Sequence, residues 1–79
     1  MRLSVHYFAA FREAAGTESE ALETGAATPA ALFAECAGRH PGLRRYSASL
    51  VAINDEMADW GAALSDGDRV LFFPPVAGG

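Results

Sequence analysis

The stretch Ser65-Asp66-Gly67-Asp68-Arg69-Val70-Leu71-Phe72-Phe73 joins a turn to a strand and decides the fold. Residues 65–68 are a strong turn signal, because Asp and Gly tolerate the backbone angles of tight turns. The five residues that follow are rich in β-branched and aromatic side chains and predict a strand over 69–73. Val70, Leu71 and Phe72 are apolar in succession, which is typical of a strand in the middle of a sheet with both faces buried.

A second strand is predicted at the start of the chain, where apolar and polar residues alternate over residues 2–9. Its odd positions should face the core, which places Phe8 on the opposite face. Residues 11–16 indicate a short helical turn that ends at a glycine. Residues 18–24 are compatible with an acidic edge strand paired to the first. The predicted core positions are Leu3, Val5 and Tyr7.

One long helix is predicted to begin at Thr28-Pro29 and to end before Pro41-Gly42. Its apolar stripe should pack on the core, with Cys36 as a buried thiol and His40 in a structural role in the last turn. The stripe consists of Leu32, Phe33, Cys36, Ala37 and His40. Residues 43–47 are expected to form a loop, 49–54 a strand, 55–56 a turn and 57–60 a short strand.

This order of elements predicts an α+β protein with the β-grasp (ubiquitin-like) architecture, in which a mixed sheet of four to five strands packs on one main helix. The first and last strands would lie side by side and parallel in the middle of the sheet. We therefore expect one domain over residues 1–73, from which a C-terminal tail, residues 74–79, protrudes.

Composition narrows the function classes. The 79 residues carry a formal net charge of −4, and all six basic residues are arginines, so the chain offers no ε-amine to which a copy of itself could be conjugated. The basic residues form no cluster beyond Arg44-Arg45, which argues against nucleic-acid binding. The negative net charge instead favours a partner with a basic surface. No apolar run reaches the length of a membrane span, and we expect a cytoplasmic protein. A single cysteine argues against zinc, iron–sulfur and electron-carrier sites.

The tail Pro74-Pro75-Val76-Ala77-Gly78-Gly79 presents little except a carboxylate. The two prolines stop the strand and stiffen the chain, and the small residues after them are narrow enough to enter a tunnel. An ionised carboxylate is a poor electrophile, so acyl chemistry on it needs activation by another enzyme. No nucleophile elbow, metal-binding histidine pair or phosphate loop accompanies it, so a self-contained enzyme is not expected. The alternative is a frayed terminus.

The sequence resembles the sulfur-carrier small subunit of molybdopterin synthase, a family of β-grasp proteins. The resemblance covers nearly the whole chain. Its most specific part is the Asp-Gly-Asp turn followed at fixed distance by Phe-Phe-Pro-Pro-Val-x-Gly-Gly. The matching segments are Tyr7-Phe8-Ala9, Arg12-Glu13, Gly16-Thr17, Val51-Ala52-Ile53-Asn54 and residues 64–79.

The resemblance implies that an ATP-dependent enzyme adenylates the carboxylate of Gly79 and that sulfur then replaces AMP to give a thiocarboxylate. The tail would enter the large subunit of the synthase and transfer sulfur to a cyclic pyranopterin phosphate. No metal or stably bound cofactor is implied, since ATP is used by the activating enzyme. The implied partner-binding residues are Gly78, Ala77, Val76, Pro75 and Pro74 in the tail and Phe73, Phe8, Met57 and Arg12 on the domain.

Several alternatives stay open on the sequence alone. Phe8, Met57 and Phe73 could instead belong to the core. The carrier could serve the thiamine pathway, whose sulfur carrier has the same fold and a Gly-Gly end. The chain could also be a ubiquitin-like protein modifier, or a β-grasp binding module that carries no sulfur.

Overall fold

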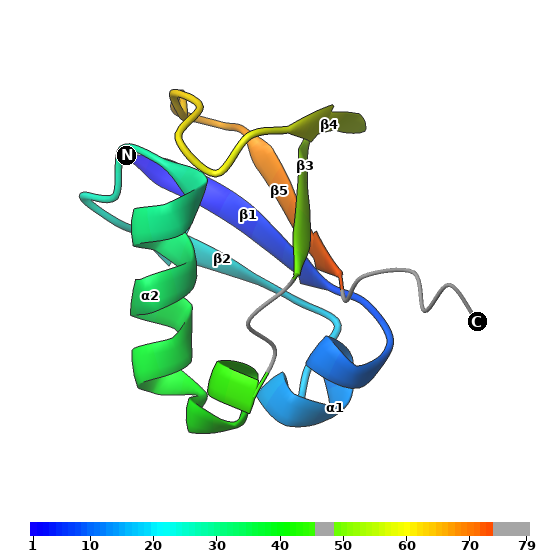
Figure 1. Cartoon of the computed structure of the whole chain (residues 1–79). Helices are drawn as coiled ribbons and strands as arrows, with labels where there is room; N and C mark the ends of the chain where they lie inside the picture. Colours follow the sequence, from blue (N-terminus) through cyan, green and yellow to red (C-terminus); the bar gives the residue numbers. More distant parts are fainter. Residues whose placement is uncertain (46–48, 74–79) are drawn as a thin grey trace.

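The computed structural model describes residues 1–45 and 49–73. Within them the chain forms five strands, two α-helices and one 3-10 helix (Figure 1). The elements in chain order are β1 Arg2–Tyr7, α1 Ala10–Ala15, β2 Ser19–Glu23, α2 Pro29–Arg39, η1 Pro41–Arg45, β3 Leu50–Ile53, β4 Glu56–Ala58 and β5 Arg69–Phe73.

The strands form one mixed sheet in the order β2-β1-β5-β3-β4. β1 and β5 are parallel neighbours in the middle, with Val5 opposite Val70, and β3 runs antiparallel to β5 on its other side. The predicted β-grasp topology is confirmed. Because β1 and β5 are parallel, the chain enters the sheet at one end and leaves β5 at the other.

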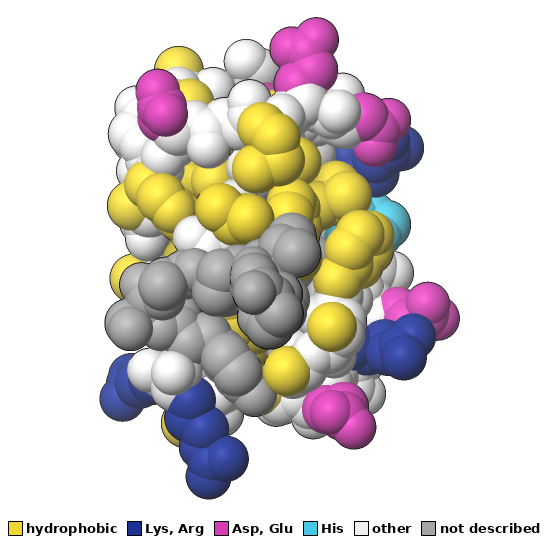
Figure 2. All heavy atoms as spheres, turned by 45° about the vertical axis from the view of Figure 1, so that its right-hand side comes forward, with side chains coloured by type: hydrophobic (Ala, Val, Ile, Leu, Met, Phe, Trp, Pro, Cys, Tyr) yellow, Lys and Arg dark blue, Asp and Glu magenta, His cyan; other side chains and the backbone are white. Residues whose placement is uncertain are grey.

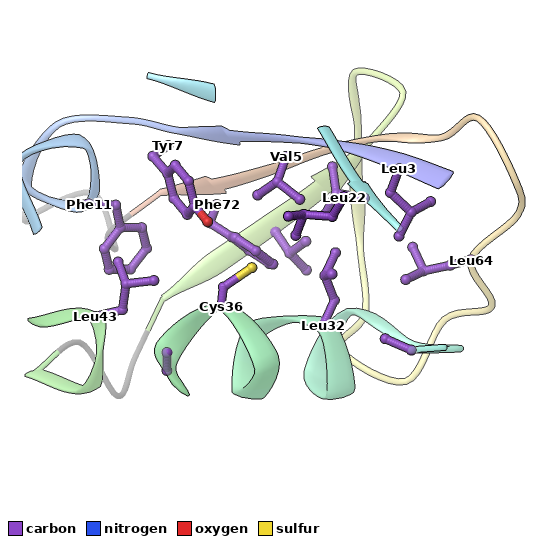
Figure 3. Close-up of a cluster of buried hydrophobic side chains, with 14 residues drawn as sticks. Leu3, Val5, Tyr7, Phe11, Leu22, Leu32, Cys36, Leu43, Leu64 and Phe72 are labelled. Atoms are coloured by element: carbon purple, nitrogen blue, oxygen red, sulfur yellow. The ribbon is translucent and has the colours of Figure 1, made fainter. Parts of the chain in front are cut away.

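Helix α2 covers one face of the sheet and encloses the hydrophobic core (Figure 3). It begins as predicted: the Oγ1 of Thr28 accepts a hydrogen bond from the backbone N–H of Ala31 at 3.2 Å, and Pro29 occupies the first turn. The odd positions of β1 and the apolar stripe of α2 face each other in the core, as predicted. Their buried side chains include Leu3, Val5, Tyr7, Leu32 and Cys36.

Aromatic packing fixes the end of β5 in this core. The ring of Phe72 is fully buried and stacks on that of Trp60, with centroids 5.8 Å apart and an interplanar angle of 11°. Phe33 of α2 meets the same Phe72 ring edge-on at 5.0 Å. Each such aromatic pair stabilises the fold by about 0.5–1.5 kcal/mol beyond the effect of its buried area. These contacts therefore hold β5 in place up to its penultimate residue, Phe72.

A polar cluster ties the C-terminal end of α2 to β1 and β2. The carboxylate of Glu20 accepts hydrogen bonds from the Tyr7 hydroxyl at 2.6 Å and from His40 Nε2 at 2.9 Å, and it pairs with Arg39 at 3.3 Å. His40 therefore has the structural role that the sequence predicted.

Local boundaries differ from the predictions at three places. Strand β1 ends at Tyr7 because Ala9 has a φ of 53°, which no strand residue adopts. Residues 43–45, expected to be part of a loop, belong to the 3-10 helix Pro41–Arg45, whose Leu43 enters the core. The hairpin after β3 turns at Asn54 and Asp55, both with positive φ, so β4 starts at Glu56 and ends before Trp60.

Candidate functional site on the outer face of the sheet

The face of the sheet opposite α2 carries apolar side chains along β5. Strand alternation sends Val70 and Phe72 into the core, whereas Leu71 and Phe73 lie on the outer face and are half-buried. The expectation that β5 is buried on both faces is therefore wrong. No described helix covers the outer face, and its apolar residues are partly open to solvent.

Phe8, Met57 and Phe73 form an exposed patch on this face, named here the apolar patch. Phe8 and Met57 are 47% and 61% exposed. The rings of Phe8 and Phe73 contact each other, with centroids 6.1 Å apart. Figure 2 shows hydrophobic side chains gathered on this side of the molecule. The alternative that Phe8 and Met57 belong to the core is excluded by their exposure, while Phe73 is intermediate.

Adjacent strands extend the apolar patch across β3. Directly paired residues share a face of the sheet, so Leu50 lies on the same face as Phe73, and Ala52 on the same face as Leu71 and Met57. Sequence reasoning missed these residues of the face. The available signal is the run of consecutive apolar residues in β3 and β5, which places apolar side chains on both faces of each strand.

Backbone geometry sets the position of Phe8 at the end of β1. Its N–H donates to the carbonyl of Phe72 at 3.1 Å, which continues the β1–β5 pairing by one residue. The chain then turns through Ala9, and the N–H of Phe11 donates back to the Phe8 carbonyl at 3.0 Å. A positive φ at alanine costs free energy, so the buried Phe11 ring and the strand pairing must hold this turn.

Arg12 lies on helix α1, near Phe8 of the apolar patch. Its guanidinium lies 3.9 Å from the carboxylate of Glu18, and both side chains are mostly exposed. Together with His6 and Phe8 they line a depression of about 410 Å³. A long partner side chain fits a space of this size, and the exposed Arg12–Glu18 pair contributes little stability that a partner would have to displace.

Residues 74–79, which carry six of the predicted site residues including Gly79, lie outside the described residues. The structure shows where they are attached: β5 ends at Phe73, beside Phe8 and directly after the buried Phe72. Phe8 and Phe73 of the apolar patch therefore lie at the point where β5 ends.

The phenol of Tyr7 and the thiol of Cys36 both lie in the core. Burial raises the pKa of the Tyr7 phenol far above its ordinary value, with hydrogen bonds to Cys36 and Glu20 adding to the effect. Burial likewise raises the pKa of the Cys36 thiol. In residues 1–45 and 49–73, no three His, Cys, Asp or Glu side chains are grouped to hold a metal ion, and no helix is long and apolar enough to cross a membrane.

The fold and this face together define a ubiquitin-like β-grasp protein whose last strand ends beside an apolar patch. A model described as the ThiS family matches residues 5–79, and the chain belongs to that family. A curated relative from Chlamydomonas reinhardtii, named molybdopterin synthase sulfur carrier subunit, is 37% identical over 83 residues, covering 100% of each chain.

Solved structures agree with this assignment. The crystal structure of SAMP1 from Haloferax volcanii superposes with a TM-score of 0.85 at 30% identity, over 100% of each chain. Subunits 1 and 2 of the molybdopterin-converting factor from Helicobacter pylori were solved as a complex, and the matching chain has a TM-score of 0.70 at 27% identity, again over 100% of each chain.

Proposed function

We propose that the chain is the sulfur carrier of a molybdopterin synthase and that the carboxylate of Gly79 is its functional group. The observation that carries this proposal is the apolar patch, in which the exposed Phe8 and the half-buried Phe73 lie at the end of β5 and the exposed Met57 lies on the same face of the sheet. The full-length similarity to a named sulfur carrier subunit supports it.

The chemistry follows from the weakness of a carboxylate as an electrophile. An activating enzyme joins the Gly79 carboxylate to the α-phosphate of ATP and releases pyrophosphate, so that AMP becomes the leaving group. Sulfide-level sulfur then attacks the acyl carbon, and a C–S bond forms as the C–O bond to AMP breaks. AMP leaves with the electron pair, and the product is a thiocarboxylate. The thiocarboxylate sulfur is the nucleophile delivered to the cyclic pyranopterin phosphate.

Docking on the apolar patch would bring the tail into the large subunit. Phe8 and Met57 supply exposed apolar area of the kind found at the centre of protein interfaces, and Arg12 supplies a charged rim. The Helicobacter pylori complex of subunits 1 and 2 supports a large subunit as partner. Threading by Val76, Ala77 and Gly78 and docking of the activating enzyme on the same patch belong to this proposal.

The likeness to SAMP1, a small archaeal modifier protein, favours protein modification as a second candidate. Both functions use an activated C-terminal glycine, but a modifier transfers the acyl group to an amine of another protein, whereas a carrier transfers sulfur. A search for higher-mass conjugates in extracts of the cells that make this chain separates them. The thiamine-pathway alternative predicts that loss of the chain creates a thiamine requirement instead of loss of molybdopterin.

Adding one alanine after Gly79 tests the proposal. The extension moves the carboxylate one residue beyond the position that the activating enzyme must reach, so molybdopterin formation by the reconstituted enzymes should be lost while the thermal unfolding midpoint is unchanged. The matched control adds the same residue before Met1 and should retain activity. Molybdopterin formation by the Gly79-extended chain would show that the mechanism is wrong.

A further inference from the structure

We propose that the chain is built to withhold nucleophiles from its own activated tail, so that the acyl group of Gly79 reacts only with a nucleophile that a partner presents. This inference rests on the proposed function, because only a tail that becomes activated needs such protection. It is carried by the identity, the burial and the position of every strong nucleophile in the described part of the chain.

The basic side chains are the first observation. All six are arginines, and four whose ion pairs are defined are 45–70% exposed in their side chains: Arg2, Arg12, Arg39 and Arg69. A guanidinium stays protonated and delocalised at any physiological pH and does not attack acyl groups, whereas an exposed lysine amine does. The arginines therefore give the surface positive charge without adding amines that could attack the acyl group of the tail.

The amino group of Met1 is the second observation. It donates a hydrogen bond to the carbonyl of Thr24 at 2.8 Å, which occupies it at the edge of the sheet. The parallel pairing of β1 and β5 places it at the end of the sheet opposite Phe73 (Figure 1). The length of β1 separates the two ends by roughly 17–20 Å, close to the roughly 20 Å limit for six extended residues, so the tail would have to run straight back to reach it.

The thiol of Cys36 and the phenol of Tyr7 are buried in the core. Cys36 and Tyr7 are 0% and 1% exposed, so neither can approach an acyl group outside the core. Burial also keeps the thiol and the phenol in their unreactive protonated forms by raising the pKa of each. One ring nitrogen of each histidine is hydrogen-bonded, His6 Nε2 to Ser4 and His40 Nε2 to Glu20.

The reaction that this arrangement prevents is aminolysis. An amine nitrogen attacks the Gly79 acyl carbon, a C–N bond forms, and the bond to AMP or to sulfur breaks. The leaving group takes the electron pair and the amine proton passes to water. The product is an amide, either internal or between two copies, and it destroys the carrier. An amine tethered near the tail would have a high effective concentration, so even one lysine there should matter.

A C-terminal thioester of the full chain tests this inference without any activating enzyme. We would compare the natural sequence with Arg45→Lys and Arg2→Lys, which keep the charge. Arg45 lies on η1 in a depression shared with Ala10 and Ala14 of α1, at the end of the sheet where β5 ends. Arg2 opens β1 at the far end. Intact-mass spectrometry distinguishes the hydrolysed chain from an internal amide, which is lighter by one water.

The natural chain should mainly hydrolyse, Arg45→Lys should form at least about tenfold more amide, and Arg2→Lys should stay close to the natural chain. The inference would be overturned if the natural chain formed an amide at Met1, or amide-linked dimers, in amounts similar to the amide formed by Arg45→Lys. It would also be overturned if Arg45→Lys formed no amide. Because the thioester is made chemically, either result is independent of whether a cellular enzyme activates Gly79. Enzymatic activation is measured in a separate assay, by the release of pyrophosphate from ATP.

Discussion

Glu20 shows how a single residue connects three elements of this small fold. Its carboxylate on β2 accepts from Tyr7 of β1 and from His40 at the end of α2, and it pairs with Arg39. Burial alone would raise the pKa of Glu20, but the hydrogen bonds from Tyr7 and His40 and the charge of Arg39 outweigh it and hold the pKa below its ordinary value. The ionised form is therefore the one that the folded state stabilises.

The lowered pKa of Glu20 predicts acid sensitivity. A carboxylate with a lower pKa in the folded than in the unfolded chain contributes its full stabilisation above about pH 5, and this is lost as the pH falls through the folded-state pKa. Glu20→Gln should lower the free energy of unfolding at pH 7 by about 1–3 kcal/mol, measured by urea denaturation, and should flatten its decline between pH 5 and pH 3.

The matched control for this prediction is Glu23→Gln, three residues along the same strand. The Glu23 side chain is 69% exposed and pairs with Arg2 at 3.5 Å, so its substitution should change the free energy of unfolding by less than about 0.5 kcal/mol. Equal losses in the two variants would contradict the role of the Glu20 cluster.

At the scale of elements, β5 divides two tasks between its faces. Phe72 points into the core against Trp60 and Phe33, and Phe73 lies on the outer face against Phe8. Adjacent residues of one strand thus hold the fold and form the docking patch. The tail is attached at the point where both tasks meet.

This division predicts opposite effects for two neighbouring substitutions. Phe72→Ala should cost about 3–5 kcal/mol of unfolding free energy, because it opens a cavity in a small core. Phe73→Ala should cost much less stability but should weaken binding of the large subunit at least about tenfold, measured by calorimetry with both proteins folded. Binding unaffected by Phe73→Ala would remove Phe73 from the docking patch, and the same substitution at Phe8 then shows whether any of the patch is used.

For the whole molecule, the sequence predicts the order of elements because each has a local signal. Thr28-Pro29 caps α2, Gly16 ends α1 in a left-handed conformation, and the alternation of β1 fixes its core face. The turn at Ala9 could not be predicted, since alanine has no preference for positive φ and only the packing of Phe11 requires it. The 3-10 helix of residues 41–45 depends in the same way on a tertiary contact, that of Leu43.

The candidate site was predictable only in part. Exposure of Phe8 follows from alternation in β1, but the share of the outer face that belongs to β3 depends on strand order and register, which no local pattern encodes. The apolar run in β5 was assigned to burial because a central strand usually has both faces covered. Here helix α2 covers one face, and Phe8, Met57 and Phe73 on the other face stay partly or largely exposed.

The most direct test of the central claim is the intact mass of the chain through one round of sulfur transfer. After incubation with an activating enzyme, ATP and a sulfur donor, the mass should rise by about 16 Da as one oxygen of the Gly79 carboxylate is replaced by sulfur. Adding the large subunit and the cyclic pyranopterin phosphate should return the chain to its original mass as molybdopterin forms. A chain that never gains this mass, or keeps it while molybdopterin accumulates, would contradict sulfur carriage by Gly79.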